Sequence, residues 1–252
     1  MKSIIAMAPE GKGGVGKSLL MQVVATALQD DGRSRVGFLD SDTTNSNLAS
    51  IFEGVRSADL RKVEASGTIK NAIKQIEDGK IDHLVFDVGA RDEAGIINVL
   101  PFMALEAKRV KATIIAFRPL TLSSNVQTNA TIFAVNVAPR YGVKTIFVRN
   151  VAQGRTVDDF AYWDKTEVRR NAIAAGVLEM DLEDAGTRWG DEAGGFGITL
   201  AEAALGKFER AGEFAAEAAK IFDEDIQAWL GIWLDRQCQV IREVIDRATS
   251  SS

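Results

Sequence analysis

Residues 11–18 read Gly-Lys-Gly-Gly-Val-Gly-Lys-Ser, and this stretch decides the fold. An apolar run, Ile-Ile-Ala-Met-Ala, precedes it at residues 4–8, and a segment with helically spaced apolar residues follows it. A strand, a glycine-rich turn and a helix in this order form a phosphate-binding loop, because backbone N–H groups and the positive end of the helix dipole face the same anion. The stretch therefore predicts a nucleotide site on an α/β fold.

The positions of this loop are expected to share the binding of one nucleotide. The expected binding residues are Gly11, Lys12, Gly13, Gly14, Val15, Gly16, Lys17, Ser18 and Leu19. The glycine N–H groups face phosphate oxygens, Lys17 reaches the β and γ phosphates, and Ser18 offers its hydroxyl to Mg²⁺. A glycine-rich stretch can be a simple turn, but the complete pattern with these flanks favours phosphate binding.

Two later apolar runs end in acidic residues. The run Val-Gly-Phe-Leu leads into Asp40 and Asp42, and the run His-Leu-Val-Phe leads into Asp87, followed closely by Gly89. Ligands of open α/β sheets bind at the carboxyl ends of the strands, so these residues are expected beside the loop. Gly89 is expected to present its N–H to the γ-phosphate and to act as a pivot, since glycine adopts φ values closed to other residues. Either segment alone could be an ordinary turn.

A second lysine, Lys12, lies inside the loop, where phosphate-binding loops accept almost any residue. This placement resembles the deviant Walker A motif of the ParA/MinD family of dimeric ATPases. The resemblance implies a homodimer that sandwiches ATP, with Lys12 acting across the interface and Lys17 acting within its own subunit, and an ADP-bound or nucleotide-free monomer. A solvated lysine in a loop is the alternative for Lys12. Leu19 departs from the family, which usually has threonine there to contact the α-phosphate.

The resemblance covers about residues 1–150 and assigns the acidic residues by position. It implies that Asp42 orients the attacking water, that Asp40 supports the water shell of Mg²⁺, and that Asp87 holds Mg²⁺ through water. With Ser18, the last two form the expected metal site. The implied cofactors are therefore ATP or ADP and Mg²⁺.

Two asparagines complete the implied nucleotide site. Asn47 falls on the segment that responds to the γ-phosphate in the family. Asn150 ends a late strand where the family holds the base, and its amide offers a donor and an acceptor to adenine. An asparagine that only closes a strand into a turn fits that position equally well. The sequence Asp-Val-Gly-Ala-Arg at residues 87–91 looks closer to that of the plasmid-borne branch of the family, the StbB-like and conjugation-associated ATPases.

Composition places the chain among ordinary globular proteins. It has 252 residues, 46% hydrophobic and 26% charged, which is enough for one substantial core. We expect a single ATPase domain over residues 1–252, with residues 155–252 mostly helical. The single cysteine, Cys238, excludes an internal disulfide and multi-cysteine metal sites within one chain. A reducing cytoplasm fits, and no apolar run is long enough to span a bilayer.

Alternating apolar runs and helical patterns predict a mostly parallel, twisted sheet with helices on both faces. Strands are expected at residues 3–8, 35–40, 60–64, 81–87, 111–117 and 144–150, and helices at 17–30, 45–52, 68–78, 92–107 and 122–141. A long glycine-rich loop is expected at 186–197, and two helices are expected to close the chain. His83, the only histidine, is expected to be a satisfied core or edge residue rather than a catalytic base.

The last helix bears on membrane binding. Its apolar stripe consists of Ile226, Trp229, Leu230, Trp233, Val240, Ile241, Val244 and Ile245. A membrane-surface helix has a basic polar face. Between residues 223 and 247 there are six acidic residues and three arginines. We therefore expect this stripe to pack on the body of the protein or on a partner subunit, and not on a membrane.

Direct binding of DNA is weighed from local charge, because the net charge of −5 gives no global attraction to it. Partition-type members of the family bind DNA through basic residues of later helices, and the candidates here are Arg149, Arg155, Lys165, Arg169 and Arg170. Acidic residues surround them, which favours a solvated surface of mixed charge.

The sequence therefore predicts an ATPase that cycles between an ATP-bound dimer and a monomer. In the family such a cycle controls association with DNA or with a DNA-binding adaptor protein, in plasmid or chromosome segregation or in conjugal transfer. Two other interpretations stay open: an ATP-dependent small-molecule ligase or kinase on the same scaffold, and a nucleotide-binding scaffold without hydrolysis.

Overall fold

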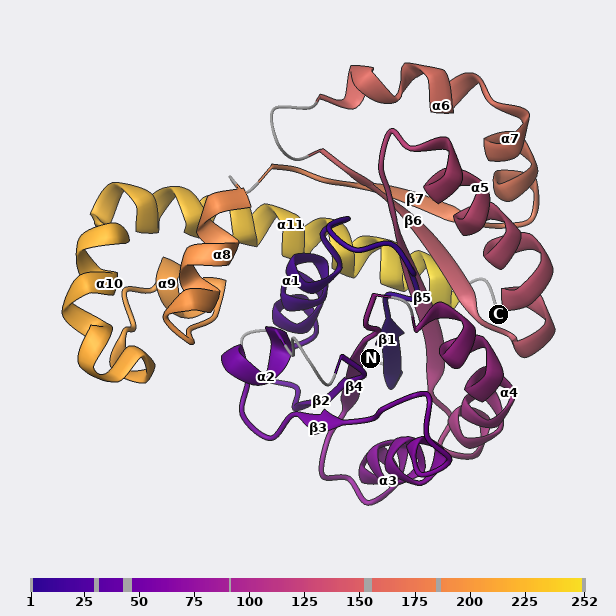
Figure 1. Cartoon of the computed structure of the whole chain (residues 1–252), viewed down its shortest axis with the longest axis horizontal. Helices are drawn as coiled ribbons and strands as arrows, with labels where there is room; N and C mark the ends of the chain where they lie inside the picture. The colour runs from indigo at the N-terminus through magenta and orange to yellow at the C-terminus, as the bar shows by residue number, and fades with distance from the viewer. Residues whose placement is uncertain are drawn as a thin grey trace.

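The computed structural model describes residues 2–29, 32–42, 47–90, 92–151, 156–184 and 187–250. Within these ranges the centre of the fold is a seven-stranded sheet in the order β3-β2-β4-β1-β5-β6-β7, in which every neighbouring pair is parallel (Figure 1). The strands are β1 (Ile4–Met7), β2 (Val36–Asp40), β3 (Arg56–Ser57), β4 (His83–Asp87), β5 (Thr113–Leu120), β6 (Lys144–Asn150) and β7 (Leu178–Leu182). The expectation of a mostly parallel sheet is confirmed.

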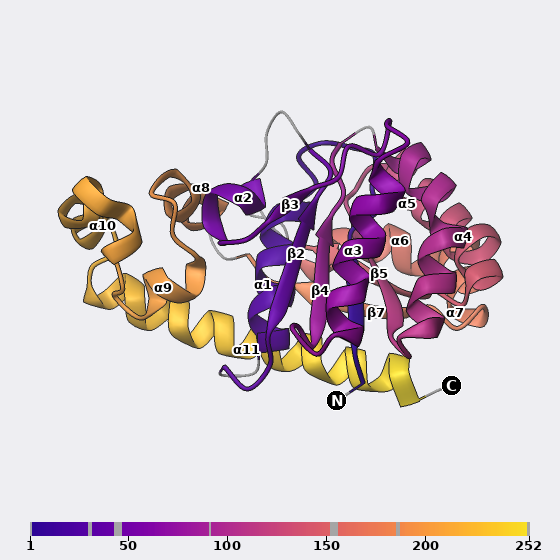
Figure 2. The same ribbon diagram turned by 90° about the horizontal axis from the view of Figure 1, so that it is seen from below.

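Helices cover both faces of this sheet, as expected (Figure 2). They are α1 (Lys17–Gln29), α2 (Asn47–Ile51), α3 (Ala65–Glu77), α4 (Glu93–Arg109), α5 (Ser124–Ile132), α6 (Ala161–Lys165), α7 (Glu167–Ala174), α8 (Thr187–Gly195), α9 (Leu200–Ala204), α10 (Ala215–Ile221) and α11 (Glu224–Ser250). Helices α1 and α11 pack on one face, and α3 and α4 pack on the other.

The central strands divide their side chains between two cores because successive residues of a strand point to opposite faces. In β1, Ile4 and Ala6 lie in the core under α1 and α11, whereas Ile5 and Met7 lie in the core under α3 and α4. All four side chains are fully buried. This explains why the sequence of β1 is continuously apolar and shows no alternation with polar residues.

The strand expected at residues 60–64 is wrong. These residues form turns, and the strand at this edge is the two-residue β3. The physical reason is Asp59, whose carboxylate accepts the N–H of Arg61 at 3.1 Å, while its carbonyl accepts the N–H of Lys62 at 3.0 Å. An aspartate that bonds the backbone two residues ahead starts a turn in preference to a strand.

Two further differences lie in the last hundred residues. The glycine-rich stretch expected as a loop contains helix α8, and the structure also adds a strand, β7, that the sequence did not indicate. Strand β7 pairs with β6 from Ile146↔Leu178 to Asn150↔Leu182. The helix expected at 122–141 begins as α5 and continues as a π-helical turn (Phe133–Val137) and a 3-10 turn (Ala138–Tyr141).

The apolar stripe of the last helix packs on the body of the protein, as expected. Helix α11 lies along α1 and α9 (Figure 1). Its buried residues are Leu230, Trp233, Leu234, Gln237, Cys238, Ile241, Val244, Ile245 and Ala248. Trp229 and Ile232 remain 44% and 65% exposed. Among the helices that the structure describes, none combines the length and the hydropathy needed to cross a bilayer.

Candidate functional site

A cavity of about 870 Å³ opens at the carboxyl end of the sheet, around the loop between β1 and α1. Strand β1 has β4 on one side and β5 on the other, so the connections from β1 to β2 and from β4 to β5 lead to opposite sides of it. Such a reversal leaves a crevice outside the strand ends, which is where ligands of open α/β sheets bind. The cavity walls include the whole loop from Lys12 to Leu19 together with Asp42, Asp87, Gly89 and Asn150.

The loop has a backbone conformation that requires glycine. Gly14 and Gly16 have φ values of +70° and +87°, in the left-handed region that costs other residues energy. A Cβ on Gly16 would also collide with Nδ2 of Asn150. The turn therefore brings bare backbone to the cavity, as a phosphate-binding loop requires.

Two lysines of the loop differ in their surroundings. Lys17 is 8% exposed and its Nζ donates to the carbonyl oxygen of Lys12 at 2.9 Å. Burial lowers the pKa of Lys17, and the nearby carboxylates of Asp87 and Glu10 oppose that change. Lys12 itself is exposed. The structure therefore places Lys17 inside the cradle and Lys12 on its outer rim.

Ser18 and the strand-end aspartates lie together. The hydroxyl of Ser18 donates to Oδ2 of Asp87 at 2.8 Å, and Asp40 and Asp87 are register partners at the ends of β2 and β4. Oδ1 of Asp87 is buried and has no hydrogen-bond partner among the described residues. Burial raises the pKa of Asp87 to about 7, and the bond from Ser18 opposes the rise. A buried carboxylate with a free oxygen beside a hydroxyl fits the oxygen ligands and the positive charge of Mg²⁺.

Asp42 and Gly89 face each other across the ends of β2 and β4. The N–H of Asp42 donates to Oδ1 of Asp40 at 2.8 Å, which fixes the turn after β2. A Cβ on Gly89 would lie 3.1 Å from Cβ of Asp42, closer than an ordinary contact, so a larger residue would require its neighbours to shift. Asn47 begins α2, and its side chain lies outside what the structure describes.

Asn150 supports the loop from the end of β6. Its Nδ2 donates to the carbonyl oxygen of Val15 at 2.8 Å, and its Oδ1 is buried without a partner in the described structure. Oε1 of Gln22, in the next turn of α1, is buried without a described partner as well. Both side chains line the cavity. Two free acceptors call for a ligand that brings N–H or O–H donors, and an adenosine has both.

The sequence analysis missed a buried ion-pair cluster under the loop. Arg118, in β5, is fully buried and donates to Oε2 of Glu10 at 2.9 Å and to Oε1 of Glu93 at 3.0 Å. Its guanidinium also lies 5.0 Å from the ring centre of Phe133. Oε1 of Glu10 accepts the N–H of Lys12 at 3.1 Å. The available signal was an arginine within an otherwise apolar strand, because such a charge needs a buried partner.

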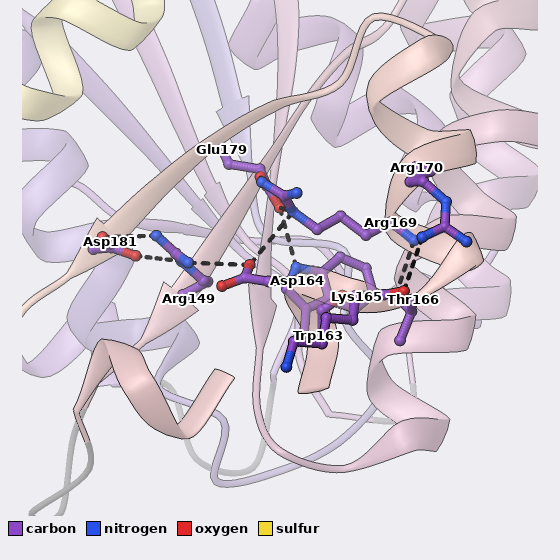
Figure 3. A network of polar contacts seen from close by, with 9 residues as sticks. All are labelled: Arg149, Trp163, Asp164, Lys165, Thr166, Arg169, Arg170, Glu179 and Asp181. Carbon is purple, nitrogen blue, oxygen red and sulfur yellow. Dashed lines mark hydrogen bonds and ion pairs between the residues drawn. The ribbon is translucent and has the colours of Figure 1, made fainter. Parts of the chain in front are cut away.

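Two of the five basic residues weighed for DNA binding, Arg149 and Arg169, are paired with acids (Figure 3). Arg149 donates to both oxygens of Asp181, at 2.6 and 3.0 Å, and Arg169 makes bonds of 2.6 and 2.9 Å to Glu179. Asp164 lies 3.3 Å from Arg149 and 3.5 Å from Arg169. The mixed-charge interpretation therefore describes the surface around Arg149 and Arg169.

Of the other three candidates, Lys165 and Arg170 are exposed. Lys165 contributes its carbonyl oxygen, which accepts from Arg170 at 2.9 Å. Arg155 lies outside the described residues.

His83 is a satisfied core residue, as expected. It is 2% exposed, and its Nδ1 accepts the N–H of Ile4 at 3.2 Å. Burial lowers its pKa, so the neutral ring is the favoured form. It lies at the start of β4, at the end of the strand away from the cavity.

Comparison with protein-family models finds no match, and comparison with curated proteins finds none either. Among solved structures, the MinD cell division protein of Aquifex aeolicus is 15% identical, with 87% of this chain and 95% of that chain covered and a TM-score of 0.45. A ParA family ATPase from Chlorobium tepidum is 14% identical over 86% and 98% of the two chains, with a TM-score of 0.48.

The signal recognition particle 54 kDa protein of Aeropyrum pernix, solved with GDP, is 13% identical over 99% and 76% of the two chains, with a TM-score of 0.40. These similarities concern the overall arrangement of strands and helices. What the pocket can do follows from its own residues.

Proposed function

We propose that this protein is a Mg²⁺-dependent ATPase of the ParA/MinD kind, which dimerises around ATP and separates after hydrolysis. The observation that carries the proposal is the convergence of Lys17, the Ser18–Asp87 pair, Asp42 and Gly89 on one cavity around a glycine-built loop. These residues come from the ends of β1, β2 and β4. Phosphoryl transfer needs this combination of anion cradle, metal ligands and a carboxylate for the nucleophile.

Each residue has a role in this proposal. The loop N–H groups and Lys17 bind the phosphates, and Asp42 accepts a hydrogen bond from the attacking water and orients it toward the γ-phosphate. Ser18 and, through water, Asp87 and Asp40 would hold Mg²⁺, which supplies positive charge to the phosphate oxygens when bound. Asn150 and Leu19 lie where the nucleoside half of the ligand would contact the cavity wall.

Lys12 supports the dimer in this proposal. It is exposed on the rim, and the carboxylate of Glu10 holds its backbone N–H. An exposed ammonium at the rim can reach the phosphates of a nucleotide on a second copy of the chain. We assign it the charge-stabilising role across the interface.

The proposed output of the cycle is association with a partner protein that itself binds DNA, in segregation or conjugal transfer. The pairing of Arg149 and Arg169 with carboxylates supports an adaptor over direct contact with DNA. Guanidinium groups held by buried or half-buried acids are poor phosphate ligands, since the acid must first be displaced.

The test combines ATP binding with measurement of mass. Wild type with Mg²⁺ is expected to bind ATP and to double its mass in light scattering, and Asp42→Ala is expected to keep the dimer because hydrolysis stops. Lys17→Ala is expected to lose binding, whereas Lys12→Ala is expected to bind ATP as a monomer. Lys70→Ala, on exposed α3 surface, is the matched control. ATP-dependent dimers of Lys12→Ala would refute the role given to Lys12, and absence of ATP binding by wild type would refute the whole proposal.

A further inference from the structure

The side chain of Ser41 occupies a position fixed by the sheet. Ser41 directly follows β2 and is 1% exposed. Its backbone N–H donates to the carbonyl oxygen of Asp87 at 3.0 Å, which continues the pairing of β2 with β4 by one residue. The hydroxyl is therefore held at the carboxyl ends of two adjacent strands, next to the proposed metal ligands.

This hydroxyl makes two short hydrogen bonds. Oγ of Ser41 accepts the N–H of Gly89 at 2.8 Å and donates to Oδ2 of Asp92 at 2.8 Å. A hydroxyl has one proton and two lone pairs, so both bonds form at once and each fixes the direction of the other. The serine thus joins β2 to both ends of the turn at residues 89–92.

The turn leads directly into α4. The N–H of Asp92 donates to the carbonyl oxygen of Gly89 at 3.1 Å, and the carbonyl oxygen of Asp92 accepts the N–H of Ile96 at 2.9 Å. Gly89 therefore connects, through Asp92, to the first turn of a 17-residue helix. Gly89 and the first turn of α4 are thus neighbours in one chain of hydrogen bonds.

The Gly89 N–H has two competing acceptors in the proposed cycle. It carries a single proton, and a hydrogen bond weakens steeply when that proton is aimed away from its acceptor. The γ-phosphate of ATP, which Gly89 is proposed to bind, therefore has to draw this N–H away from the Ser41 hydroxyl. ADP has no γ-phosphate and leaves the Ser41 bond in place.

We propose that Ser41 is a positioning residue that competes with the γ-phosphate for the Gly89 N–H, and so sets how strongly the protein prefers ATP to ADP. The inference rests on the proposed nucleotide function. Loss of the hydroxyl leaves the Gly89 N–H without its acceptor until a γ-phosphate arrives, which strengthens ATP binding and leaves ADP binding alone. A neutral hydrogen bond of ordinary strength corresponds to about a threefold to tenfold change in the ratio of the two dissociation constants.

The experiment measures dissociation constants for ADP and for the β,γ-imido analogue of ATP, each with Mg²⁺, by titration calorimetry. Ser41→Ala is expected to raise the preference for the triphosphate about threefold to tenfold at unchanged ADP affinity. Ser124→Ala is the control, since it also removes a serine hydroxyl, and Ser124 is exposed at the start of α5, outside the cavity. Ser41→Thr keeps the hydroxyl and is expected to behave as wild type.

An unchanged or reduced preference in Ser41→Ala, with ADP still bound, overturns the inference. Failure of wild type to bind either nucleotide is a different result and overturns the proposed function. Should Ser41→Ala not fold, the amide resonance of Gly89 in wild type decides: it is expected to shift with the ATP analogue and to stay in place with ADP. A resonance that moves equally with both nucleotides refutes the competition.

Discussion

Replacing Arg118 with methionine is expected to lower the free energy of unfolding by about 3 to 5 kcal/mol, the cost of breaking a buried ion pair. The guanidinium is fully buried between Glu10 at 2.9 Å and Glu93 at 3.0 Å. Methionine keeps the apolar length of the side chain but leaves Glu10, which is 1% exposed, without its opposite charge. The carboxylate of Glu10 causes the loss, because it cannot reach water and keeps only the weaker attraction of Lys17.

The size of this loss is expected to depend on pH. Burial already raises the pKa of Glu10 above 4.5, and Arg118 opposes that rise. Without Arg118 the folded variant keeps a proton that the unfolded chain releases above its own pKa. Since the folded state then binds more protons, the stability of the variant falls as pH rises from 4.5 through the raised pKa, and the penalty is smaller in acid.

Urea denaturation followed by circular dichroism, at a mildly acidic and a mildly alkaline pH, measures both effects. The triple variant Arg118→Met, Glu10→Gln, Glu93→Gln is expected to recover most of the loss, because none of these three residues is then a buried charge without its partner. Arg35→Met is the control, since its pair with Asp82 is 60% and 41% exposed and is worth about 1 kcal/mol or less. A loss below about 1 kcal/mol in Arg118→Met, or a triple variant no more stable than the single one, would refute the reasoning.

Three further predictions concern the loop, the metal ligands and the core histidine. Gly16→Ala places a Cβ against Asn150 at a φ of +87° and is expected to weaken ATP binding about tenfold to a hundredfold in a fluorescence titration, whereas Gly67→Ala, which meets open space, is expected to change nothing. Asp87→Asn removes the negative charge beside Ser18, so ATP affinity is expected to become independent of Mg²⁺; a persisting Mg²⁺ effect would contradict the assignment. His83 has a pKa lowered below 6.5 by burial, so the unfolded chain takes up a proton first as pH falls, and stability is expected to be full above 6.5 and to decline below it. His83→Gln is expected to reduce the decline in stability below pH 6.5. An unchanged slope would show that other groups cause the decline.

Short-range patterns in the sequence were sufficient for the central strands. The apolar runs of β1, β4 and β6 predicted strands there because each is buried on both faces and needs no help from distant residues to be recognised. The turn at Asp59 and the helix α8 were not predicted, because each depends on specific contacts that the apolar pattern does not show. The side chain of Asp59 starts a turn just before the segment expected to be a strand, and tertiary packing on α9 and α2 holds a glycine-rich helix.

The candidate site also has a part that the local sequence predicted and a part that depends on distant residues. The order of residues in the loop predicted a phosphate-binding turn, since all the residues of that pattern lie within eight consecutive positions. Contacts that hold the loop come from far away in the chain: Asn150 reaches Val15 across 135 residues, and Arg118 reaches Glu10 across 108. Nothing in the local pattern around Ser41 indicated that it would accept the N–H of Gly89, 48 residues away.

By itself, the sequence determined a parallel α/β sheet and the place of the glycine-rich turn between β1 and α1, because the periods of strand and helix and the conformational needs of glycine are local properties. Only the tertiary structure decided which polar groups meet beneath that loop and which of them are left with a free acceptor. Those partnerships depend on strand order and register, which bring distant residues within hydrogen-bonding distance and cannot be read from spacing along the chain.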